Sequence, residues 1–276
     1  MRAALIQLTS GDDPVANLPI LQGYVDKAAR QGADFILTPE VTNCLSTSRS
    51  HQREVLQDQA NDLTLAAIRS QARDLKVWVL LGSLALYGET PDGRFVNRSF
   101  LIAPDGSIRA QYDKIHMFDV TINDTETYRE SSGYQPGAQA VLADATIGQV
   151  GMTICYDMRF PALYRGLAQM GAQIITVPSA FSPVTGAAHW ETLLRARAIE
   201  TGAFVLAPAQ CGAHPASRGK PRKTWGHSLA VAPWGEVLAD GGDAPGITMV
   251  DFDLSQVEAA RQRIPSLTHD QPFEGP

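Results

Sequence analysis

The sequence predicts an α/β fold in which two sheets pack between layers of helices. Short β-rich apolar runs alternate along the chain with longer segments of helical period, which is typical of layered α/β proteins rather than of helical bundles or all-β barrels. The second half of the chain repeats the alternation of strands and helices found in the first half. Because no low-complexity linker separates the halves, residues 1–276 are expected to form a single domain.

The first half is predicted to contain strands and helices that end at recognisable signals. The run DFILT stops at a Pro-Glu pair, and the turn sequence PDGS lies between two apolar runs that should pair as a hairpin. The polar connection 116–136 is too long for a simple spacer and is expected to be a functional loop. The predicted elements are strands at 3–8, 34–38, 77–86, 97–103 and 108–112, and helices at 14–31 and 62–75.

The second half is predicted to continue the same pattern. A helix should follow Pro161, and a loop should run through to Lys223. The turn sequence PWG should then connect two short paired strands. The remaining predicted elements are strands at 147–154, 174–177, 204–207, 228–232 and 236–239, and a helix at 188–201.

Composition indicates a globular protein and argues against several classes of partner. The chain has 276 residues, 44% of them hydrophobic, which is enough apolar material for a large core. Its formal net charge of −6, without a dense basic face, argues against nucleic acid as a partner. No apolar run approaches the ~20 residues of a membrane-spanning helix, and MRAALIQLTS is too short for a signal peptide. We therefore expect a cytoplasmic protein without a membrane partner.

The cysteines and the short motifs predict neither a metal site nor a cofactor. Cys44, Cys155 and Cys211 lie far apart without CxxC spacing, which fits neither a disulfide framework nor a zinc site. The sequence also lacks a GxGxxG motif, a Walker loop and an HExxH motif. Cys44 and Cys211 have no neighbouring base or lysine and are expected to be inert.

Three side chains of catalytic type fall just past the ends of predicted strands: Glu40 after DFILT, Lys114 after the hairpin and Cys155 after MTI. Each has an ordinary structural interpretation when taken alone, and Cys155 could be the last core residue of its strand. Together they suit nucleophilic catalysis, because a thiol needs a base and a nearby positive charge. The set predicts a thiol hydrolase in which Glu40 is the base and Lys114 the stabilising cation.

A second arrangement would make His116 the base, because cysteine–histidine pairs are the commoner nucleophilic arrangement in thiol hydrolases. Asp157 or Asp119 would then orient the imidazole. His116 follows Lys114 by two residues and projects in the same direction only if the strand continues, so we expect His116 to be structural. Asp157 is expected to cap the turn that follows Cys155.

The three motifs resemble those of the nitrilase superfamily of carbon-nitrogen hydrolases, whose signature is a Glu-Lys-Cys triad. LTPE carries Glu40, YDKIHMFDV carries Lys114 and GMTICYDMRFP carries Cys155. The stretches LLRARAIETGAFVLAPAQCGAH and GHSLAVAPWGEVLA are similar to the Nit branch of that superfamily. The resemblance runs nearly end to end and implies a four-layer α-β-β-α sandwich with two mixed sheets. The sequence YDMRFP after the cysteine is less similar to true nitrilases, which favours amide rather than nitrile hydrolysis.

The resemblance also implies roles for individual residues. Cys155 would attack an amide carbonyl, Glu40 would move the proton, and Lys114 would stabilise the oxyanion. The N–H of Tyr156 would join Lys114 in the oxyanion hole, because the chain turns there from strand to helix. Glu130 matches the second glutamate of the family and would position Lys114 or the substrate, although by itself it reads as a solvated loop carboxylate.

The substrate implied by the resemblance is a small-molecule 2-oxo acid amide, deaminated glutathione, cleaved to 2-oxoglutarate and cysteinylglycine. Arg159 has a guanidinium fork that suits the carboxylate of such a substrate, and it suits equally a salt bridge on a helix surface. Phe181 and Thr185 would line the same pocket by resemblance. The loop 211–223 is either a solvated face or a reader of the peptide carboxylate. Its cations are Arg218, Lys220, Arg222 and Lys223.

Two alternative functions remain at this point. The first is an ω-amidase acting on 2-oxoglutaramate, which has the same acyl half but releases only ammonia. The second is a non-catalytic binding module with the same fold. The resemblance further implies a homodimer or higher homo-oligomer, in which the segment after Pro265 crosses to a partner chain.

Overall fold

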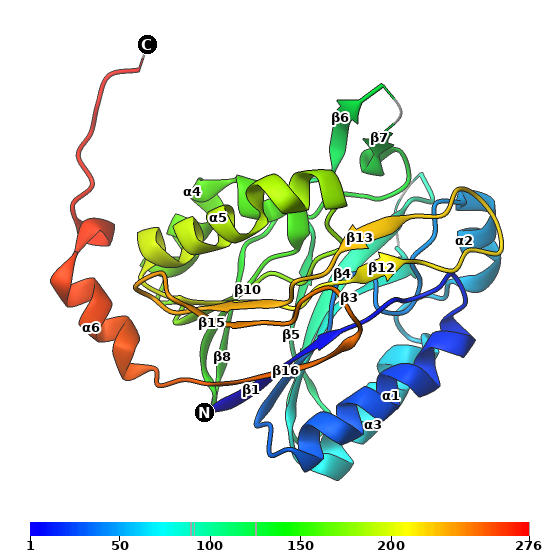
Figure 1. The fold of residues 1–276 in the computed structure, drawn as a ribbon, viewed down its shortest axis with the longest axis horizontal. Coiled ribbons are helices and arrows are strands. Elements are labelled where there is room, and N and C mark those ends of the chain that lie inside the picture. The colour runs from blue at the N-terminus through cyan, green and yellow to red at the C-terminus, as the bar shows by residue number, and fades with distance from the viewer. Residues whose placement is uncertain (89, 91, 125, 276) are drawn as a thin grey trace.

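The computed structural model describes residues 1–88, 90, 92–124 and 126–275, and in this part of the chain two six-stranded sheets form the centre of the fold (Figure 1). The first sheet has the order β16-β1-β2-β3-β4-β5. β1 and β3 pair in parallel with β2, whereas the pairs β1–β16, β3–β4 and β4–β5 are antiparallel. Its strands are β1 (Arg2–Gln7), β2 (Phe35–Leu37), β3 (Trp78–Tyr87), β4 (Phe95–Ile102), β5 (Ile108–Asp113) and β16 (Gly246–Asp251).

The second sheet is also mixed and has the order β15-β14-β11-β10-β9-β8. β9 and β11 pair in parallel with β10, and the outer pairs are antiparallel. Its strands are β8 (Val141–Ala145), β9 (Gly148–Met152), β10 (Ile174–Thr176), β11 (Phe204–Ala207), β14 (Leu229–Val231) and β15 (Val237–Asp240). The pair of mixed sheets agrees with the architecture predicted from the sequence.

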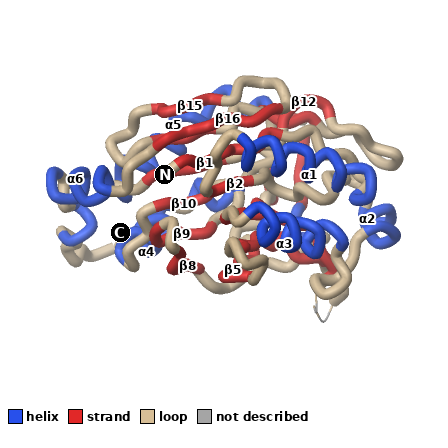
Figure 2. The backbone as a smooth tube through the Cα atoms, turned by 90° about the horizontal axis from the view of Figure 1, so that it is seen from below, coloured by secondary structure: helices blue, strands red, loops and turns tan. Residues whose placement is uncertain are grey.

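Helices cover the two outer faces of the sheet pair, which gives four layers (Figures 1 and 2). α1 (Pro14–Arg30) and α3 (Leu63–Leu75) pack on the first sheet, and α4 (Pro161–Gln169) and α5 (Pro183–Thr201) pack on the second. α2 (Arg49–Val55) lies beside the loops, and α6 (Ser255–Arg263) lies near the C-terminus. Among the described residues, no helix has the length and apolar character needed to cross a membrane.

The hydrophobic pattern of β1 shows how one strand serves two layers. Ala3 and Leu5 belong to the core between the sheets, whereas Ala4 and Ile6 belong to the core under α1 and α3. Successive side chains of a strand point to opposite faces, so a continuous apolar run is required when both faces are covered. This explains why the strands of the sequence read as apolar runs rather than as apolar-polar alternation.

The structure adds elements in the regions that sequence analysis expected to be irregular. Residues 116–136 contain the antiparallel hairpin β6 (Asp119–Asn123) and β7 (Glu126–Arg129), followed by the 3-10 turn η1 (Glu130–Ser132). The expected loop to Lys223 contains the paired strands β12 (Cys211–Ala213) and β13 (Lys223–Trp225). These strands have few buried residues, so the hydrophobic pattern that predicts sheet strands is weak in them. The predicted β4–β5 hairpin is confirmed.

Candidate active site

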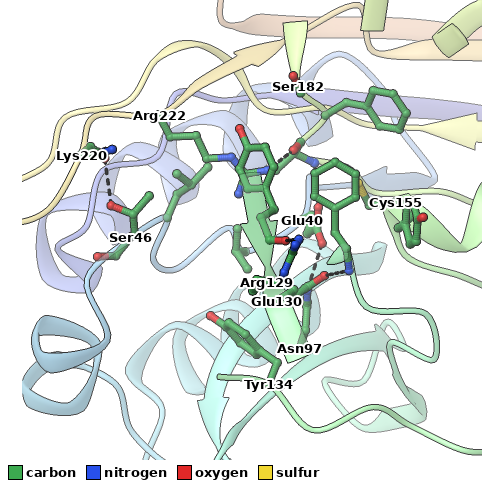
Figure 3. Close-up of a pocket in the computed structure, with 18 of the residues that line it drawn as sticks. Glu40, Ser46, Asn97, Arg129, Glu130, Tyr134, Cys155, Ser182, Lys220 and Arg222 are labelled. Atoms are coloured by element: carbon green, nitrogen blue, oxygen red, sulfur yellow. Dashed lines mark hydrogen bonds between the residues drawn. The ribbon is translucent and has the colours of Figure 1, made fainter. Parts of the chain in front are cut away.

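Glu40, Lys114 and Cys155 line one pocket of about 850 Å³. Figure 3 shows Glu40 and Cys155 in this pocket. Glu40 follows β2 and Lys114 follows β5 in the first sheet, whereas Cys155 follows β9 in the second. The two sheets therefore bring together side chains that are far apart in the sequence. The volume lies in the range of small-molecule sites and is large enough for a ligand of several residues.

Glu40 is held on both of its carboxylate oxygens. Oε1 accepts hydrogen bonds from Lys114 Nζ at 2.7 Å and from Asn97 Nδ2 at 2.9 Å. Oε2 accepts from the backbone N–H of Ala180 at 2.8 Å. The chain reaches this position past a close approach at Gly82 in β3, where any Cβ atom would collide with the main chain after β2.

Lys114 is buried between two carboxylates. Besides Glu40, its ammonium donates to Glu130 Oε2 at 2.9 Å and to Oε1 at 3.1 Å. Glu130 is fixed in turn by the N–H of Phe118, which donates to Oε2 at 2.7 Å. We call Glu40, Asn97, Lys114 and Glu130 the pocket floor. Its hydrogen bonds fix the Lys114 ammonium in one orientation.

Cys155 begins the 3-10 turn η2 (Cys155–Arg159) in an unusual backbone conformation. Its φ angle is +49°, which lies in the left-handed region that a non-glycine residue rarely adopts. Such residues concentrate at functional sites, where the surrounding structure maintains the strain. Its N–H donates to the carbonyl of Pro178 at 3.0 Å. Cys155 is only 6% exposed, so the thiol faces the pocket from a nearly buried position.

The protonation states on the floor follow from burial and charge. Burial opposes ionisation of Glu40, but the charge and hydrogen bond of Lys114 outweigh it and hold the pKa of Glu40 below its usual value. Burial alone would lower the pKa of Lys114, yet Glu130 and Glu40 raise it well above its ordinary value. Burial and then the charge of Glu40 raise the pKa of the Cys155 thiol. The resting site at neutral pH therefore holds a carboxylate, an ammonium and a protonated thiol.

The structure does not place His116 as a base for Cys155. His116 Nδ1 lies 2.7 Å from Asp157 Oδ1, and its ring stacks on Phe160 with 3.5 Å between centroids. His116 is absent from the described pocket lining. Asp119, the other expected orienting group, instead accepts hydrogen bonds from Ser131.

Asp157 has a wider role than the expected cap. It is fully buried, and Oδ2 accepts from the N–H of Ile154 at 2.8 Å, as a cap would. It also accepts from the hydroxyl of Tyr112 at 2.7 Å and from the N–H of His116 at 3.0 Å. One carboxylate therefore ties the segment that carries Lys114 to the turn that carries the cysteine.

The residues expected to bind substrate divide into two groups. Tyr156 and Phe181 line the pocket, whereas Arg159 and Thr185 are not among its described lining residues. The guanidinium of Arg159 lies 5.5 Å from the Phe181 ring centroid, and its Nη2 lies 3.2 Å from His189 Nδ1. The Thr185 hydroxyl donates to a main-chain carbonyl at 3.4 Å. Arg159 therefore contacts a pocket residue without lining the pocket itself.

The cations of the basic loop 211–223 also fall into two groups, those that line the pocket and one that does not. Lys220, Arg222 and Lys223 line the pocket, and we call these three residues the pocket mouth. Figure 3 shows Lys220 and Arg222 among the lining residues. Arg218 lies outside the pocket lining, where it forms an exposed ion pair with Glu54 at 2.7 Å. Of the two interpretations of the loop, the solvated face fits Arg218, because its charge is engaged on the surface.

Sequence reasoning missed Asn97 and the N–H of Ala180, both of which hold Glu40. Asn97 was detectable in principle, because the β4–β5 register pairs Arg98 with Asp113 and so places Asn97 opposite Lys114. The carbonyl of Asn97 accepts from the N–H of Lys114 at 3.0 Å. The backbone donor at Ala180 leaves no signal in the residue type.

The other cysteines and possible metal ligands add no further reactive group. Cys44 also lines the pocket, and burial raises the pKa of its thiol to about 12. Its Sγ donates to the carbonyl of Asp12 at 3.4 Å. Within the described ranges, the structure contains no group of three or more His, Cys, Asp or Glu side chains arranged to hold a metal ion.

Comparisons with known proteins show which family the chain resembles. The family model described as carbon-nitrogen hydrolase matches residues 2–262. A deaminated glutathione amidase of Yersinia enterocolitica is 40% identical over 270 residues, which cover 97% of this chain and 92% of that protein. The sequence similarity therefore extends through both halves of the fold.

Solved structures show the same likeness. The C. elegans NitFhit protein matches with a TM-score of 0.89 and 34% identity, over 98% of this chain and 65% of that chain. An amidase from Nesterenkonia sp., solved after addition of acrylamide at its active-site cysteine, matches with a TM-score of 0.77 and 26% identity over 96% of this chain and 98% of that chain. These likenesses confirm the four-layer fold and the family expected from the three motifs. With the family model covering residues 2–262 and a relative 40% identical over nearly the whole chain, this protein belongs to the carbon-nitrogen hydrolase family.

Proposed function

We propose that the protein is a thiol amidohydrolase that cleaves deaminated glutathione to 2-oxoglutarate and cysteinylglycine. The observation that supports this proposal most is the arrangement of Glu40, which lines the same pocket as Cys155 and is itself fixed by Lys114 at 2.7 Å. A base, a thiol and a fixed cation at one pocket are the groups that acyl transfer needs. The 40% identical relative that is named a deaminated glutathione amidase supports the choice of substrate.

The first half-reaction forms an acyl-thioester. Glu40 takes the proton of the Cys155 thiol as Sγ bonds to the amide carbonyl carbon, and the carbonyl π electrons move onto oxygen. Lys114, with the N–H of Tyr156, stabilises this oxyanion. When the oxyanion collapses, the C–N bond breaks and Glu40 returns its proton to the departing nitrogen. The amine leaves neutral, and Glu40 is again a carboxylate.

The second half-reaction releases the acid. Glu40 takes a proton from a water molecule whose oxygen attacks the thioester carbonyl, and Lys114 again faces the oxyanion. Collapse breaks the C–S bond, and the thiolate of Cys155 recovers a proton from Glu40. One carboxylate therefore serves both half-reactions. We propose that Glu130 positions Lys114, because both of its oxygens contact the ammonium at 2.9 and 3.1 Å.

Measurement of kcat/KM for deaminated glutathione and for 2-oxoglutaramate tests the proposed substrate. The two amides share an acyl half, so their difference reports only what the amine half contributes. We expect a clear preference for deaminated glutathione, because the pocket of about 850 Å³ extends to a cationic mouth. Equal values would favour the ω-amidase alternative.

The Cys155→Ala variant tests the chemistry, and we expect it to lose amide turnover. The alternative of a non-catalytic binding module is distinguished by mass spectrometry after incubation with an electrophilic amide analogue. The proposed enzyme should carry the adduct on Cys155. An unmodified Cys155 would support the binding module.

We further propose a homodimer or higher homo-oligomer in the cytoplasm. The support comes from the family resemblance and from the segment after Pro265, which extends away from the sheets and exposes 89% of Phe273 (Figure 1). Sedimentation should give a mass above that of the 29.8 kDa chain. A monomeric mass would contradict the assembly.

A further inference from the structure

The charge of the pocket is opposite to that of the whole chain. The formal net charge of the protein is −6. Among the described residues that line the pocket, six are lysines or arginines and three are glutamates. An acidic protein that gathers an excess of cations around one cavity favours an anionic ligand there.

The cations of the pocket differ in how far they are already engaged. Lys114 is paired with both floor carboxylates. Arg49 donates to Gln52 Oε1 at 2.8 Å, and Arg129 donates to main-chain carbonyls of its own hairpin. In the part of the chain that the structure describes, the mouth residues Lys220, Arg222 and Lys223 form no ion pair. The mouth therefore holds the cations that remain free for a ligand.

Arg222 is the most fixed of these three residues. Its Nη2 donates to the carbonyl of Ala180 at 2.5 Å, and its guanidinium carbon lies 5.4 Å from the ring centroid of Tyr128 in β7. Its Nε is buried and has no hydrogen-bond partner among the described residues. A buried donor without a partner is costly, and a planar guanidinium with free N–H groups matches the two oxygens of a carboxylate.

The position of Arg222 relative to Glu40 indicates which part of a substrate it meets. Ala180 accepts from Arg222 with its carbonyl and donates to Glu40 Oε2 with its N–H at 2.8 Å. Lys114 binds the other oxygen of Glu40. In the proposed mechanism the leaving nitrogen receives its proton from Glu40, so a chain attached to that nitrogen can reach Arg222 by passing Ala180.

We propose that Arg222 binds the carboxylate of the amine half of the substrate and so selects amides of amino acids or short peptides over primary amides. This inference rests on the proposed amidase function and adds a recognition residue to it. Lys220 and Lys223 supply additional positive charge beside the same carboxylate. Arg218, although it lies in the same basic loop, takes no part because Glu54 already occupies it.

The test compares two substrates that differ only at the recognised group: deaminated glutathione and its C-terminal carboxamide. We expect wild-type kcat/KM to favour the carboxylate by roughly tenfold to a hundredfold, the usual worth of a charged hydrogen-bonded pair. Arg222→Gln should bring this ratio close to one by slowing the carboxylate substrate far more than the carboxamide. Any effect carried through Glu40 or through the 2-oxo acid end is common to both compounds and cancels in the ratio.

Two further variants control the experiment. Arg218→Gln removes a cation of the same loop outside the pocket and should leave the ratio at its wild-type value. Arg222→Lys keeps the charge but loses the fork, and it should give an intermediate ratio even if Arg222→Gln proves hard to fold. Circular dichroism checks the fold of each variant.

The outcomes separate this inference from the function on which it rests. A wild-type enzyme that cleaves both compounds with a ratio near one would overturn the inference alone. So would an Arg222→Gln variant that slows both compounds equally. A wild-type enzyme that cleaves neither compound would overturn the proposed function and this inference with it.

Discussion

The floor and the mouth of the pocket are built in opposite ways. On the floor, Lys114 lies 2.7 Å from Glu40 and 2.9 Å from Glu130, and its charge is fully engaged. At the mouth, Lys220 and Lys223 are exposed, and Arg222 has a donor without a partner in the described structure. The floor is thus preorganised for charge that develops during a reaction, whereas the mouth is open to a ligand. Substitutions on the floor should change kcat, and substitutions at the mouth should change the choice of substrate.

The largest expected effect is the loss of the base on the floor. In Glu40→Gln the amide oxygen can still accept from Lys114 and the fold should persist, but no group remains to take the thiol proton. We expect kcat to fall by about 10²- to 10⁴-fold, the typical contribution of a positioned general base. Steady-state kinetics with deaminated glutathione measures it.

The matched control for Glu40→Gln is His116→Ala. His116 contacts Asp157 rather than the pocket, so its loss should reduce kcat far less. The opposite result, in which Glu40→Gln stays active and His116→Ala does not, would establish a cysteine–histidine enzyme. His116 would then be the base in place of Glu40 of the pocket floor.

The next largest effect concerns stability. Lys114→Met leaves Glu40 and Glu130 without their shared cation, and loss of one partner of a buried ion pair costs about 3–5 kcal/mol in the free energy of unfolding. Denaturant unfolding at neutral pH should show this loss. A change below about 1 kcal/mol would mean that the floor carboxylates are not held as charges.

Lys114→Met should also change how the free energy of unfolding depends on pH. In the wild-type protein the pKa of Glu40 is lowered, so its stabilising contribution is present above its unfolded pKa and is lost as the pH falls through the folded pKa. Without Lys114, burial raises the pKa of Glu40, and protonation then relieves the unpaired charge. The difference in unfolding free energy between wild type and variant should therefore shrink toward acidic pH.

A smaller effect is expected at Asp157, which links the segment that carries Lys114 to the turn that carries Cys155. Asp157→Asn keeps the size of the side chain but replaces one acceptor oxygen by a donor, so it cannot satisfy Ile154, Tyr112 and His116 together. We expect a loss of about 1–3 kcal/mol in unfolding free energy and a fall in kcat with little change in KM, because Lys114 and Cys155 lose their common anchor. A change in KM alone would contradict this role.

The sequence shows the floor more clearly than the mouth, for a physical reason. Glu40, Lys114 and Cys155 stand at the ends of apolar strands, and strands that pair in a sheet bring such ends together. The exposed loop 211–223 has no comparable pattern, so the sequence cannot separate Arg222, which faces the pocket, from Arg218, which pairs with Glu54.

Backbone hydrogen-bond donors, and hairpins of mostly exposed residues, also leave no recognisable pattern in the sequence. The N–H of Ala180 holds Glu40, yet every residue except proline carries an N–H. The β6–β7 hairpin has mostly exposed residues, so its strands lack the apolar run that revealed β2 and β9. Tyr128 of that hairpin could be placed beside Arg222 only by the fold itself.

The smallest predicted effect is that of the Arg222 charge at the mouth on the pKa of Glu40 on the floor. After burial and Lys114, the positive charge of Arg222 is among the causes that set the pKa of Glu40, and it lowers that pKa. In Arg222→Gln the pKa of Glu40 should therefore rise, and the acid limb of the kcat/KM profile should move to higher pH by a few tenths to about one unit.

The carboxamide substrate is the right probe, because it lacks the carboxylate that Arg222 is proposed to bind. Arg218→Gln removes the same charge outside the pocket and should leave the limb in place. An unmoved limb in Arg222→Gln would mean that the mouth acts on substrate choice alone, whereas a limb that moves equally in both variants would reflect net charge rather than the contact through Ala180.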